Sequence, residues 1–455
     1  MDDRERLLSA LEHTQQKMLT LVESLSDDQL QVPYHPGVNP PLWEAGHCAF
    51  FYETFILKPL DGVPSHDPSM DDLWDSFHVD HEDRWSPGLF PDKQTTLAYQ
   101  DSVYRRIHQR IQTQPLTPAV HYLYKYAIFH QNMHIESMLW CRQTEGYPPP
   151  PFAELESAPS SEPLAEGDVT VPGGTYRIGM PAGSTEFAAR DFAFDNEKPG
   201  FDVTLPAFRI SPTLVSNRQF QAFVEAGGYE RPELWSFGGR KWLQTPQDMA
   251  FGTGEPTAHK EAPRHPVYWR RKGGQWYERH FDQWLPLEAS HPVKHVSYWE
   301  VEAYCNWAGR RLPTEFEWEV AALGNPAGET RQRFPWGDAM DPERVDMDGR
   351  HFARVPVDAY AGGDSPFGCR QMIGTLWEWT SNQFLPYDGF AVDMYPFMST
   401  LQFGDHKTTR GGSCATYSNL IRGTYRQAYH PARQDVFVGF RTCALDATAK
   451  EGTPE

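Results

Sequence analysis

The distribution of apolar residues changes near residue 147, and this change constrains the fold more than any other feature of the sequence. Before it, apolar residues recur every three or four positions, as in amphipathic helices. Residues 147–168 (YPPPPFAELESAPSSEPLAEGD) lack this periodicity and are typical of an extended linker. Beyond them, short strand-like pieces such as VPGGTYRIGM alternate with glycine turns. We therefore expect an α+β chain of two domains.

The domain boundaries follow from this pattern. We place a helical domain, a Pro-rich linker, a second domain and a flexible tail at residues 1–147, 148–169, 170–447 and 448–455, respectively. Four helices, enough for an up-and-down bundle, are expected over residues 4–26, 41–58, 94–113 and 118–143. In the second domain helices are expected over residues 216–226 and 297–309, whereas the aromatic-rich stretch 233–290 permits no assignment.

The charge of the chain excludes some classes of partner. Its 41 basic and 61 acidic residues give a formal net charge of -20, which would repel a nucleic-acid backbone and an anionic membrane. No apolar stretch reaches the roughly eighteen residues of a membrane span, and the start MDDRERLLSALEH is charged where a signal peptide would be apolar. We expect a cytoplasmic protein that binds neither nucleic acid nor membranes.

A pair of histidines lies on the fourth predicted helix, in the sequence His130-Gln-Asn-Met-His134. Positions i and i+4 share one face of a helix, so both imidazoles can bind one metal ion. With eighteen histidines in the chain this spacing also arises by chance, and two hydrogen-bonded helix histidines are the alternative interpretation. Gln131 stands where HExxH peptidases have glutamate, which disfavours that class. Glu136, about 200° round the helix from His134, is expected to support the site and not to bind metal.

The best candidate for a third ligand is His47, in the sequence PPLWEAGHCAFFYETF. It lies mid-helix among Trp43, Phe50 and Phe51, where a buried imidazole needs a partner. A core histidine satisfied by hydrogen bonds is the alternative, and the residues alone leave both open.

Motifs along nearly the whole chain carry a family resemblance. The His47 segment followed by HxxxHxE resembles the DinB-like helical domain of the nonheme iron sulfoxide synthases of ergothioneine and ovothiol biosynthesis. The second domain resembles the C-type-lectin-like fold of formylglycine-generating enzymes (sulfatase-modifying factors), through AYCNWAGRRLPTEFEWE (303–319), PWGD (335–338), GTLWEWT (374–380), RGGS (410–413) and VGFRTC (438–443). Those enzymes use a cysteine pair after GGS, whereas here only Cys414 lies there. All six cysteines are scattered without CxxC and are expected to be mostly reduced core thiols.

The resemblance implies a cofactor and a reaction. It implies Fe(II) held by His47, His130 and His134, with O2 as co-substrate. Three neutral histidines leave positions on the metal where a thiolate and O2 can bind side by side. The family joins hercynine, which is Nα-trimethylated histidine, to a sulfur or selenium donor, and a tyrosine matched here by Tyr387 supplies a proton or electron. Because ligand sites favour domain interfaces, we expect this site between the two domains.

The substrate-binding positions depart from the relatives that use γ-glutamylcysteine. Those carry paired arginines, whereas HEDRWSPGLFPDKQ here contains only Arg84, so γ-glutamylcysteine is not expected as the donor. Met133 replaces a glutamine that contacts the substrate imidazole. Arg426-Gln427-Ala428-Tyr429 replaces Arg-Asn-Trp-Asp, and an aromatic ring such as Tyr429 could hold the trimethylammonium group. The predicted substrate-binding residues are Met133, Arg84, Arg426, Gln427, Tyr429 and Arg433.

Several donors and two other functional classes stay open. HxxMHxE combined with DVFVGFRTC favours the selenoneine synthase branch, whose selenosugar donor has no amino-acid carboxylates. A cysteine-using ergothioneine or ovothiol enzyme would also lack the arginine pair. A DinB-type metal-dependent thiol S-transferase would need no O2, and a non-catalytic ligand-binding module would not depend on His130.

Overall fold

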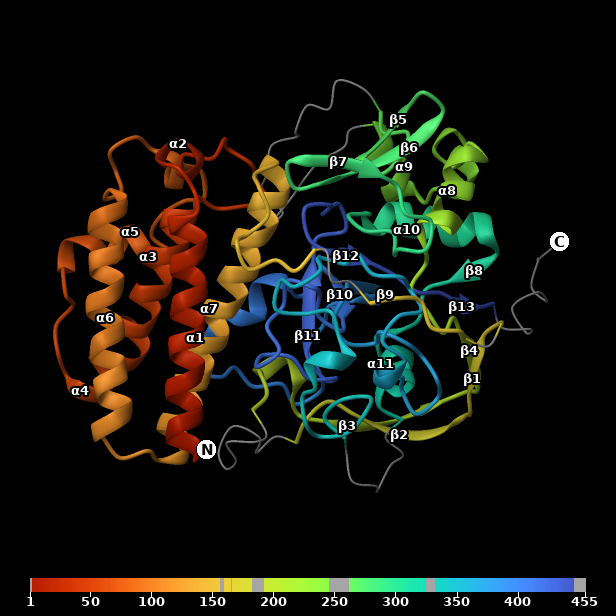
Figure 1. Cartoon of the computed structure of the whole chain (residues 1–455). Helices are drawn as coiled ribbons and strands as arrows, with labels where there is room; N and C mark the ends of the chain where they lie inside the picture. Colours follow the sequence, from red (N-terminus) through yellow and green to blue (C-terminus); the bar gives the residue numbers. More distant parts are fainter. Residues whose placement is uncertain are drawn as a thin grey trace. The chain divides into compact units, whose positions relative to one another are not determined.

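The structure is a computed structural model that describes residues 2–155, 159–164, 166–181, 192–244, 262–324 and 332–445. The predicted tail 448–455 lies outside these residues. The chain divides into two compact units (Figure 1). Of the described residues, the first contains 2–152, 192–193 and 281–283, and the second contains the others. The first is helical and the second combines strands with helices, which confirms the α+β prediction.

The first unit is a bundle of four long helices, as predicted. They are α1 (Asp3–Glu23), α3 (Pro41–Tyr52), α6 (Lys93–Thr113) and α7 (Pro118–Glu145). Helix α1 packs on α6 and α7, and α3 packs on α6 and α7. Shorter helices connect them: α2 (Asp27–Leu30), η1 (Glu53–Leu57), α4 (Lys58–Asp61), η2 (Pro68–Met70), α5 (Asp71–Trp74) and η3 (Glu82–Trp85).

Local sequence signals set the ends of helix α7. The side chain of Thr117 accepts a hydrogen bond from the backbone of Val120, and Pro118 occupies the first turn. Gly146 ends the helix with φ 68°, a conformation that favours glycine. Between these ends the helix buries polar side chains together with its apolar ones, among them His130 and Glu136. A helix with a buried polar centre needs partners for those groups.

The second predicted helix, 41–58, is interrupted. The α-helix ends at Tyr52, a π-helical turn covers Glu53–Leu57, and α4 then runs to Asp61. The interruption coincides with the buried carboxylate of Glu53, which accepts hydrogen bonds from Tyr99 (3.0 Å) and Arg106 (2.9 Å). The sequence pattern could not predict this turn because these partners lie far away in the chain.

The second unit contains small sheets. Their strand orders are β1-β4-β13-β8, β11-β10-β9-β12, β2-β3 and β5-β6-β7. The strands are β1 (Val169–Val171), β2 (Gly174–Ile178), β3 (Phe201–Leu205), β4 (Phe208–Ile210), β5 (Trp269–Lys272), β6 (Gln275–His280), β7 (Gln283–Pro286), β8 (Arg310–Arg311), β9 (Trp377–Gln383), β10 (Lys407–Arg410), β11 (Arg426–Tyr429), β12 (Val438–Gly439) and β13 (Cys443–Ala444).

Helices of the second unit confirm both predicted ones and add two. They are α8 (Asn217–Glu225), α9 (Phe237–Gln244), α10 (Tyr298–Ala308) and α11 (Glu315–Leu323). Single 3-10 turns are η5 (Asp195–Glu197), η6 (Gly228–Glu230), η7 (Pro232–Leu234), η8 (Pro342–Arg344), η9 (Ala361–Gly363), η10 (Pro396–Met398) and η11 (Thr400–Gln402). The unassigned stretch 233–290 contributes α9 and the β5-β6-β7 sheet, and its residues 245–261 lie outside the described residues.

Three of the sequence motifs of the second unit, GTLWEWT, RGGS and VGFRTC, contribute strands to one sheet. WEWT opens β9, which pairs with β10 antiparallel and with β12 parallel. The arginine of RGGS ends β10, and Gly411 follows with φ 95°. A Cβ on Gly411 would lie 2.7 Å from the carbonyl oxygen of Met372, so only glycine permits this close packing.

The predicted linker is hydrogen-bonded to the second unit in its described parts. The Glu154 amide donates to the Arg350 carbonyl (2.7 Å), and Arg370 donates to the Glu162 carbonyl (2.9 Å). The described parts of this segment are therefore attached to the second unit through contacts that no local pattern indicates.

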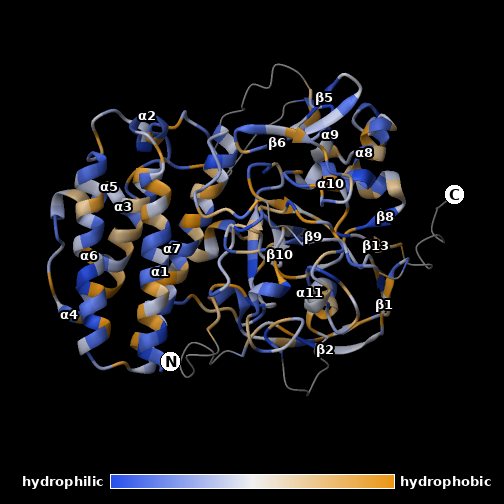
Figure 2. Cartoon of the chain, in the orientation of Figure 1, coloured by the Kyte–Doolittle hydropathy of each residue, from blue (hydrophilic) through white to orange (hydrophobic). Residues whose placement is uncertain are grey.

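The bundle helices carry both hydrophilic and hydrophobic residues along their length (Figure 2). Among the described residues, no helix combines the length and the apolar character that crossing a membrane requires.

Candidate metal centre

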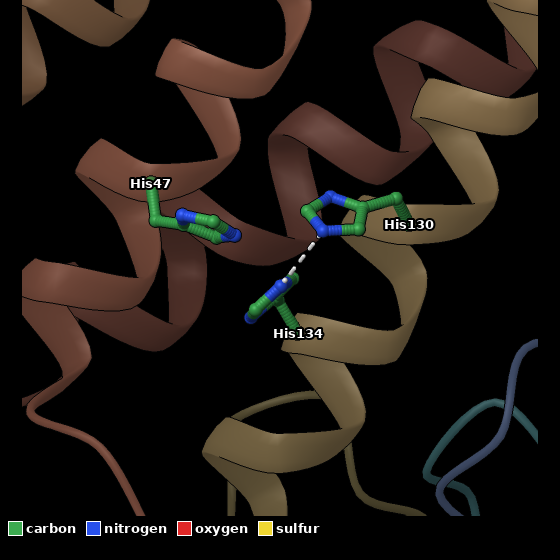
Figure 3. A group of neighbouring side chains, drawn as sticks. All are labelled: His47, His130 and His134. Atoms are coloured by element: carbon green, nitrogen blue, oxygen red, sulfur yellow. Dashed lines mark hydrogen bonds between the residues drawn. The ribbon is translucent and has the colours of Figure 1, made fainter. Parts of the chain in front are cut away.

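Three histidines converge inside the first unit (Figure 3). His47 projects from α3, and His130 and His134 project from successive turns of α7. One ring nitrogen from each lies within 4.8 Å of the others, and the Nε2 atoms of His130 and His134 are 3.1 Å apart. The structure thus brings together the three residues that the sequence predicted as metal ligands.

Hydrogen bonds define which nitrogen each histidine offers. Nδ1 of His47 lies 2.7 Å from the Trp74 carbonyl, and Nδ1 of His134 contacts the carboxylate of Glu44. Both partners accept hydrogen bonds, so both Nδ1 atoms carry the proton and both Nε2 atoms present a lone pair. Two lone pairs that face a third imidazole form a site for a cation.

Aromatic rings hold the imidazoles in place. Trp43 and Phe51 lie one turn before and one turn after His47 on α3. Trp43 stacks on His47 with ring centroids 4.7 Å apart, and Phe51 stacks on His130 at 3.8 Å. Side chains locked by such packing pre-organise a ligand set.

The buried imidazoles are neutral, as metal binding requires. Burial, and after it the charge of His134, lowers the pKa of His47 to about 3. Burial likewise lowers the pKa of His130 well below its ordinary value, with smaller contributions from His134 and His47. Protons therefore do not compete for these two ligands near pH 7.

A carboxylate that the sequence analysis missed supports this centre. Glu44 is fully buried, and its two oxygens accept hydrogen bonds from His134 Nδ1, from Ser137 (2.7 Å) and from Asn39 (3.1 Å). Burial alone would raise the pKa of Glu44, but the neighbouring His134 and these hydrogen bonds lower it to about 2. Glu136, which we expected to support the site, is buried on α7, whereas the carboxylate that contacts a predicted ligand is Glu44.

A signal for Glu44 was present in the sequence. It is the only charged residue of PLWEAGHCAFFY, and a single acid in such an apolar helix needs a buried partner.

Gly46 permits the close approach of the loop that holds His47. A Cβ on Gly46 would lie 2.5 Å from the ring of Trp74, the residue whose carbonyl accepts the His47 proton. The small residue beside His47 is therefore part of the geometry of the site.

Two predicted substrate residues also lie in the first unit. Arg84 donates to Asn39 Oδ1 (2.7 Å), and its guanidinium lies 3.9 Å above the ring of Trp43. Met133 is half-buried on α7 and precedes His134. Their binding to a substrate stays a prediction.

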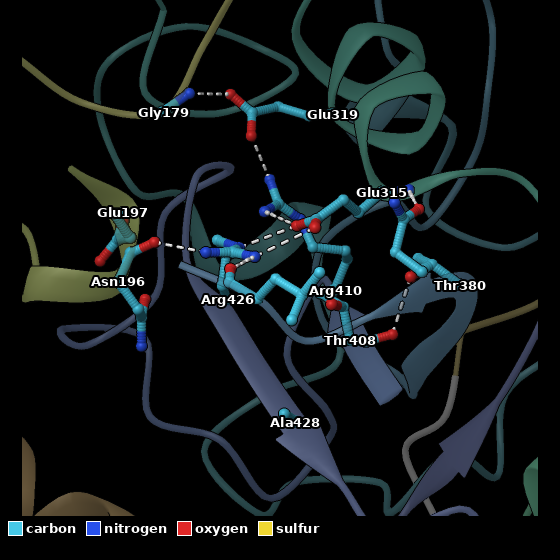
Figure 4. A network of polar contacts seen from close by, with 12 residues as sticks. Gly179, Asn196, Glu197, Glu315, Glu319, Thr380, Thr408, Arg410, Arg426 and Ala428 are labelled. Atoms are coloured by element: carbon cyan, nitrogen blue, oxygen red, sulfur yellow. Dashed lines mark hydrogen bonds and ion pairs between the residues drawn. The ribbon is translucent and has the colours of Figure 1, made fainter. Parts of the chain in front are cut away.

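Tyr387 is buried in the second unit. The guanidinium of Arg426 lies 4.0 Å above its ring and is itself bound to Glu315 through two hydrogen bonds of 2.8 and 3.0 Å, within a buried polar network (Figure 4). Burial raises the pKa of Tyr387, and its hydroxyl has no hydrogen-bond partner among the described residues. The catalytic role of Tyr387 stays a prediction.

The other predicted substrate residues lie on or just after β11. Gln427 is half-buried and Tyr429 is buried. Arg433 is bound to Asp435 (2.6 Å), and its guanidinium lies 5.5 Å from the Tyr429 ring. Arg426 and Arg433 therefore both donate hydrogen bonds to carboxylates of the protein. The sequence could not indicate these pairings.

The six cysteines are buried and free, as expected for core thiols. Cys414 lies after β10 and donates its amide to the Thr375 carbonyl (2.9 Å).

Comparisons with known proteins cover both units. Residues 152–446 match the sulfatase-modifying factor enzyme 1-like domain, and residues 10–138 match the DinB superfamily. The chain is 31% identical to the hercynine oxygenase of Mycolicibacterium smegmatis over 96% of this chain and 98% of that protein. It is 32% identical to the hercynine oxygenase of Mycobacterium tuberculosis over 97% and 99%, respectively. A formylglycine-generating enzyme of Thermomonospora curvata is 32% identical over 63% of this chain and 96% of its own length.

Proposed function

The chain belongs to the hercynine oxygenase family, and we propose from this premise that it is an iron- and oxygen-dependent enzyme that acts on hercynine. The observation that carries the proposal is the convergence of His47, His130 and His134. These residues would hold Fe(II) through ring nitrogens, of which Nε2 of His47 and His134 are free of protons. Bound iron supplies the activation of O2 next to a thiolate or selenolate.

The proposed reaction joins the imidazole of hercynine to a donor that carries a thiol or a selenol. A C–H bond of the imidazole and the S–H or Se–H bond of the donor are lost, and a carbon–sulfur or carbon–selenium bond forms. The sulfur or selenium is also oxidised, to a sulfoxide or a selenoxide. O2 accepts four electrons, and one of its oxygen atoms enters the sulfoxide or selenoxide while the other leaves as water.

Residues of the second unit would act on the substrates. The Tyr387 hydroxyl has no partner among the described residues and is therefore available to pass a proton or an electron. Arg426 would hold the Tyr387 ring in place, since it lies 4.0 Å above it. Tyr429 would contact the trimethylammonium group of hercynine by cation–π attraction.

We propose a donor without two amino-acid carboxylates. A doubly charged donor such as γ-glutamylcysteine needs two arginine forks. The segment HEDRWSPGLFPDKQ offers only Arg84, which already donates to Asn39 at 2.7 Å. A selenosugar, as in the selenoneine synthase branch, or a small thiol fits this arrangement better.

Product analysis by mass spectrometry tests the proposed function. The full chain is loaded with Fe(II) without air and mixed with hercynine and one donor at a time: a selenosugar, a thiosugar, cysteine or γ-glutamylcysteine. Air is then admitted. We expect a hercynine adduct that requires both iron and O2, with the selenosugar or a small thiol as donor.

Two controls make the assay decisive. His108 lies on α6 and contacts Glu12, outside the histidine cluster, so His108→Ala should keep the activity that His130→Ala abolishes. An adduct that forms without O2 would identify a metal-dependent thiol transferase. If hercynine is not consumed with any donor while iron is bound, the proposed substrate is wrong.

A further inference from the structure

We infer that Arg84 is a positioning residue of the metal centre, acting through Asn39, Glu44 and Trp43, and not a ligand for a substrate carboxylate. The inference rests on the proposed function in one respect: the three histidines must hold the metal. Four contacts in the first unit carry it.

The first contact fixes His134. Nδ1 of His134 donates to one carboxylate oxygen of Glu44, and the other oxygen accepts from Ser137 (2.7 Å) and Asn39 (3.1 Å). Because both oxygens accept hydrogen bonds, the carboxylate cannot rotate. The orientation of the His134 ring, and with it the direction of its Nε2 lone pair, is therefore fixed. A carboxylate behind a histidine ligand also raises its basicity toward a metal.

The second contact extends this chain to Arg84. The Asn39 amide donates to Glu44 through its nitrogen and accepts from Arg84 through its oxygen (2.7 Å). The Arg84 hydrogen bond therefore sets the orientation of the Asn39 amide, because a flipped amide would point NH2 at a guanidinium that can only donate. Arg84 thereby determines that Asn39 donates to Glu44.

The third and fourth contacts lead to His47. The guanidinium of Arg84 lies 3.9 Å above the ring of Trp43, and Trp43 stacks on His47 with an angle of 11° between the rings. One cation thus supports two of the three histidines, His134 by hydrogen bonds and His47 by stacking.

The charges of Glu44 and Arg84 also bear on metal binding. Three neutral imidazoles leave the charge of a divalent cation uncompensated, and the buried Glu44 carboxylate is the negative group bonded to one of them. Arg84 offsets the Glu44 charge without touching it, because Asn39 stands between them.

A Co(II) titration of the full chain, followed by visible absorption, tests the inference without any substrate. Glu44→Gln should weaken Co(II) binding about 10- to 100-fold, and Arg84→Met should weaken it about 3- to 10-fold, as the loss of one hydrogen bond would. Both should shift the Co(II) absorption bands, which a purely structural role would leave unchanged.

The chain offers matched controls. Glu53 and Arg106 form an ion pair (2.9 Å) in the same bundle, and in the described part of the chain neither hydrogen-bonds to the three histidines. Glu53→Gln and Arg106→Met should therefore leave Co(II) affinity and spectrum unchanged. If Arg84→Met has the same Co(II) affinity and the same Co(II) spectrum as Arg106→Met, the inference is wrong.

A second variant keeps the inference testable if Arg84→Met does not fold. Asn39→Leu removes the link between Arg84 and Glu44 and keeps both charged residues. It should weaken Co(II) binding about as much as Arg84→Met, and the double variant should be little weaker than either single variant, since both break one chain of contacts. Additive losses would overturn the inference.

Steady-state kinetics with the donor distinguishes a positioning role of Arg84 from a role as a substrate ligand. A higher KM for the donor with unchanged Co(II) affinity would make Arg84 a substrate ligand and overturn the inference. If His130→Ala also leaves Co(II) affinity unchanged, the histidine site itself fails, and with it the proposed function.

Discussion

The two units bury polar groups in different ways. In the first unit, neutral imidazoles converge, and two of them present lone pairs to a common centre. In the second unit, buried arginines lie against buried carboxylates: Arg426 with Glu315, Arg410 with Glu319, Arg422 with Glu197 and Arg441 with Glu378. Lone pairs that converge on one centre suit a cation from outside, whereas arginines that face carboxylates are satisfied within the protein. We therefore expect the first cluster to bind a cation and the second to serve as a scaffold.

Loss of a histidine ligand should have the largest effect. His130→Ala removes one of three ligands, so we expect metal affinity and product formation to fall on the order of a thousandfold. The metal-free variant should lose only the packing of the buried His130 ring on Phe51, because the Glu44–His134 contact stays in place. Metal analysis, product assay and thermal unfolding measure the three quantities. A large loss of stability in the metal-free variant would make the cluster a scaffold.

The opposite result is expected for the second unit. Arg441→Met leaves Glu378, which is bound through hydrogen bonds of 2.7 and 2.9 Å, buried without its partner. The free energy of unfolding should fall by about 3–5 kcal/mol, as chemical denaturation would show. Protein that remains folded should bind Co(II) with the affinity of the parent chain. Weakened Co(II) binding would contradict the separation of scaffold from site.

Tyr387→Phe sharpens the contrast within the second unit. The lost hydroxyl has no hydrogen-bond partner among the described residues, so stability should change by less than about 0.5 kcal/mol. If the hydroxyl transfers a proton, product formation should fall about 100-fold with unchanged metal binding. Kinetics measured beside denaturation separate the two. Full activity would remove Tyr387 from the proposed mechanism.

The sequence predicted the elements whose pattern is local. The four bundle helices and the helices at 217–225 and 298–308 carry regular apolar spacing and capping residues such as Ser216 and Ser297, and they form where expected. The stretch 233–290 was not assigned, although β5 and β6 pair as a local hairpin across Gly273-Gly274, a turn signal that the sequence analysis missed. The π-helical turn at Glu53–Leu57 depends on partners dozens of residues away, namely Tyr99 and Arg106.

The site divides in the same way. The spacing of His130 and His134 is visible in one helix, and His47 stands out as a histidine in an apolar helix. Glu44 and Asn39 were missed because their partners lie on another helix and in a loop. The ion pairs of Arg426 and Arg433 were missed for a related reason. The sequence does not distinguish an arginine that contacts a substrate from one that contacts a carboxylate of the protein.

Lowering the pH should produce the smallest effect, a loss of stability that involves one histidine in each unit. The pKa of His47 and that of His291 are about 3 in the folded chain, mainly through burial, against an ordinary value of 6.5. The unfolded chain therefore binds more protons below pH 6.5, so their contribution is complete above that pH and is lost as pH falls toward 3. At pH 5.5 each should reduce the free energy of unfolding by about 1.4 kcal/mol. Urea unfolding of metal-free protein at pH 7.5 and 5.5 checks this, and His47→Leu should reduce the pH dependence.

The most direct test of the histidine centre is an anomalous difference map at the iron absorption edge, from crystals of the full chain grown with Fe(II) in the absence of O2. We predict one peak within bonding distance of His47, His130 and His134, with Glu44 behind His134. A map without a peak at these residues, or with its iron peak at another set of side chains, would contradict the assignment.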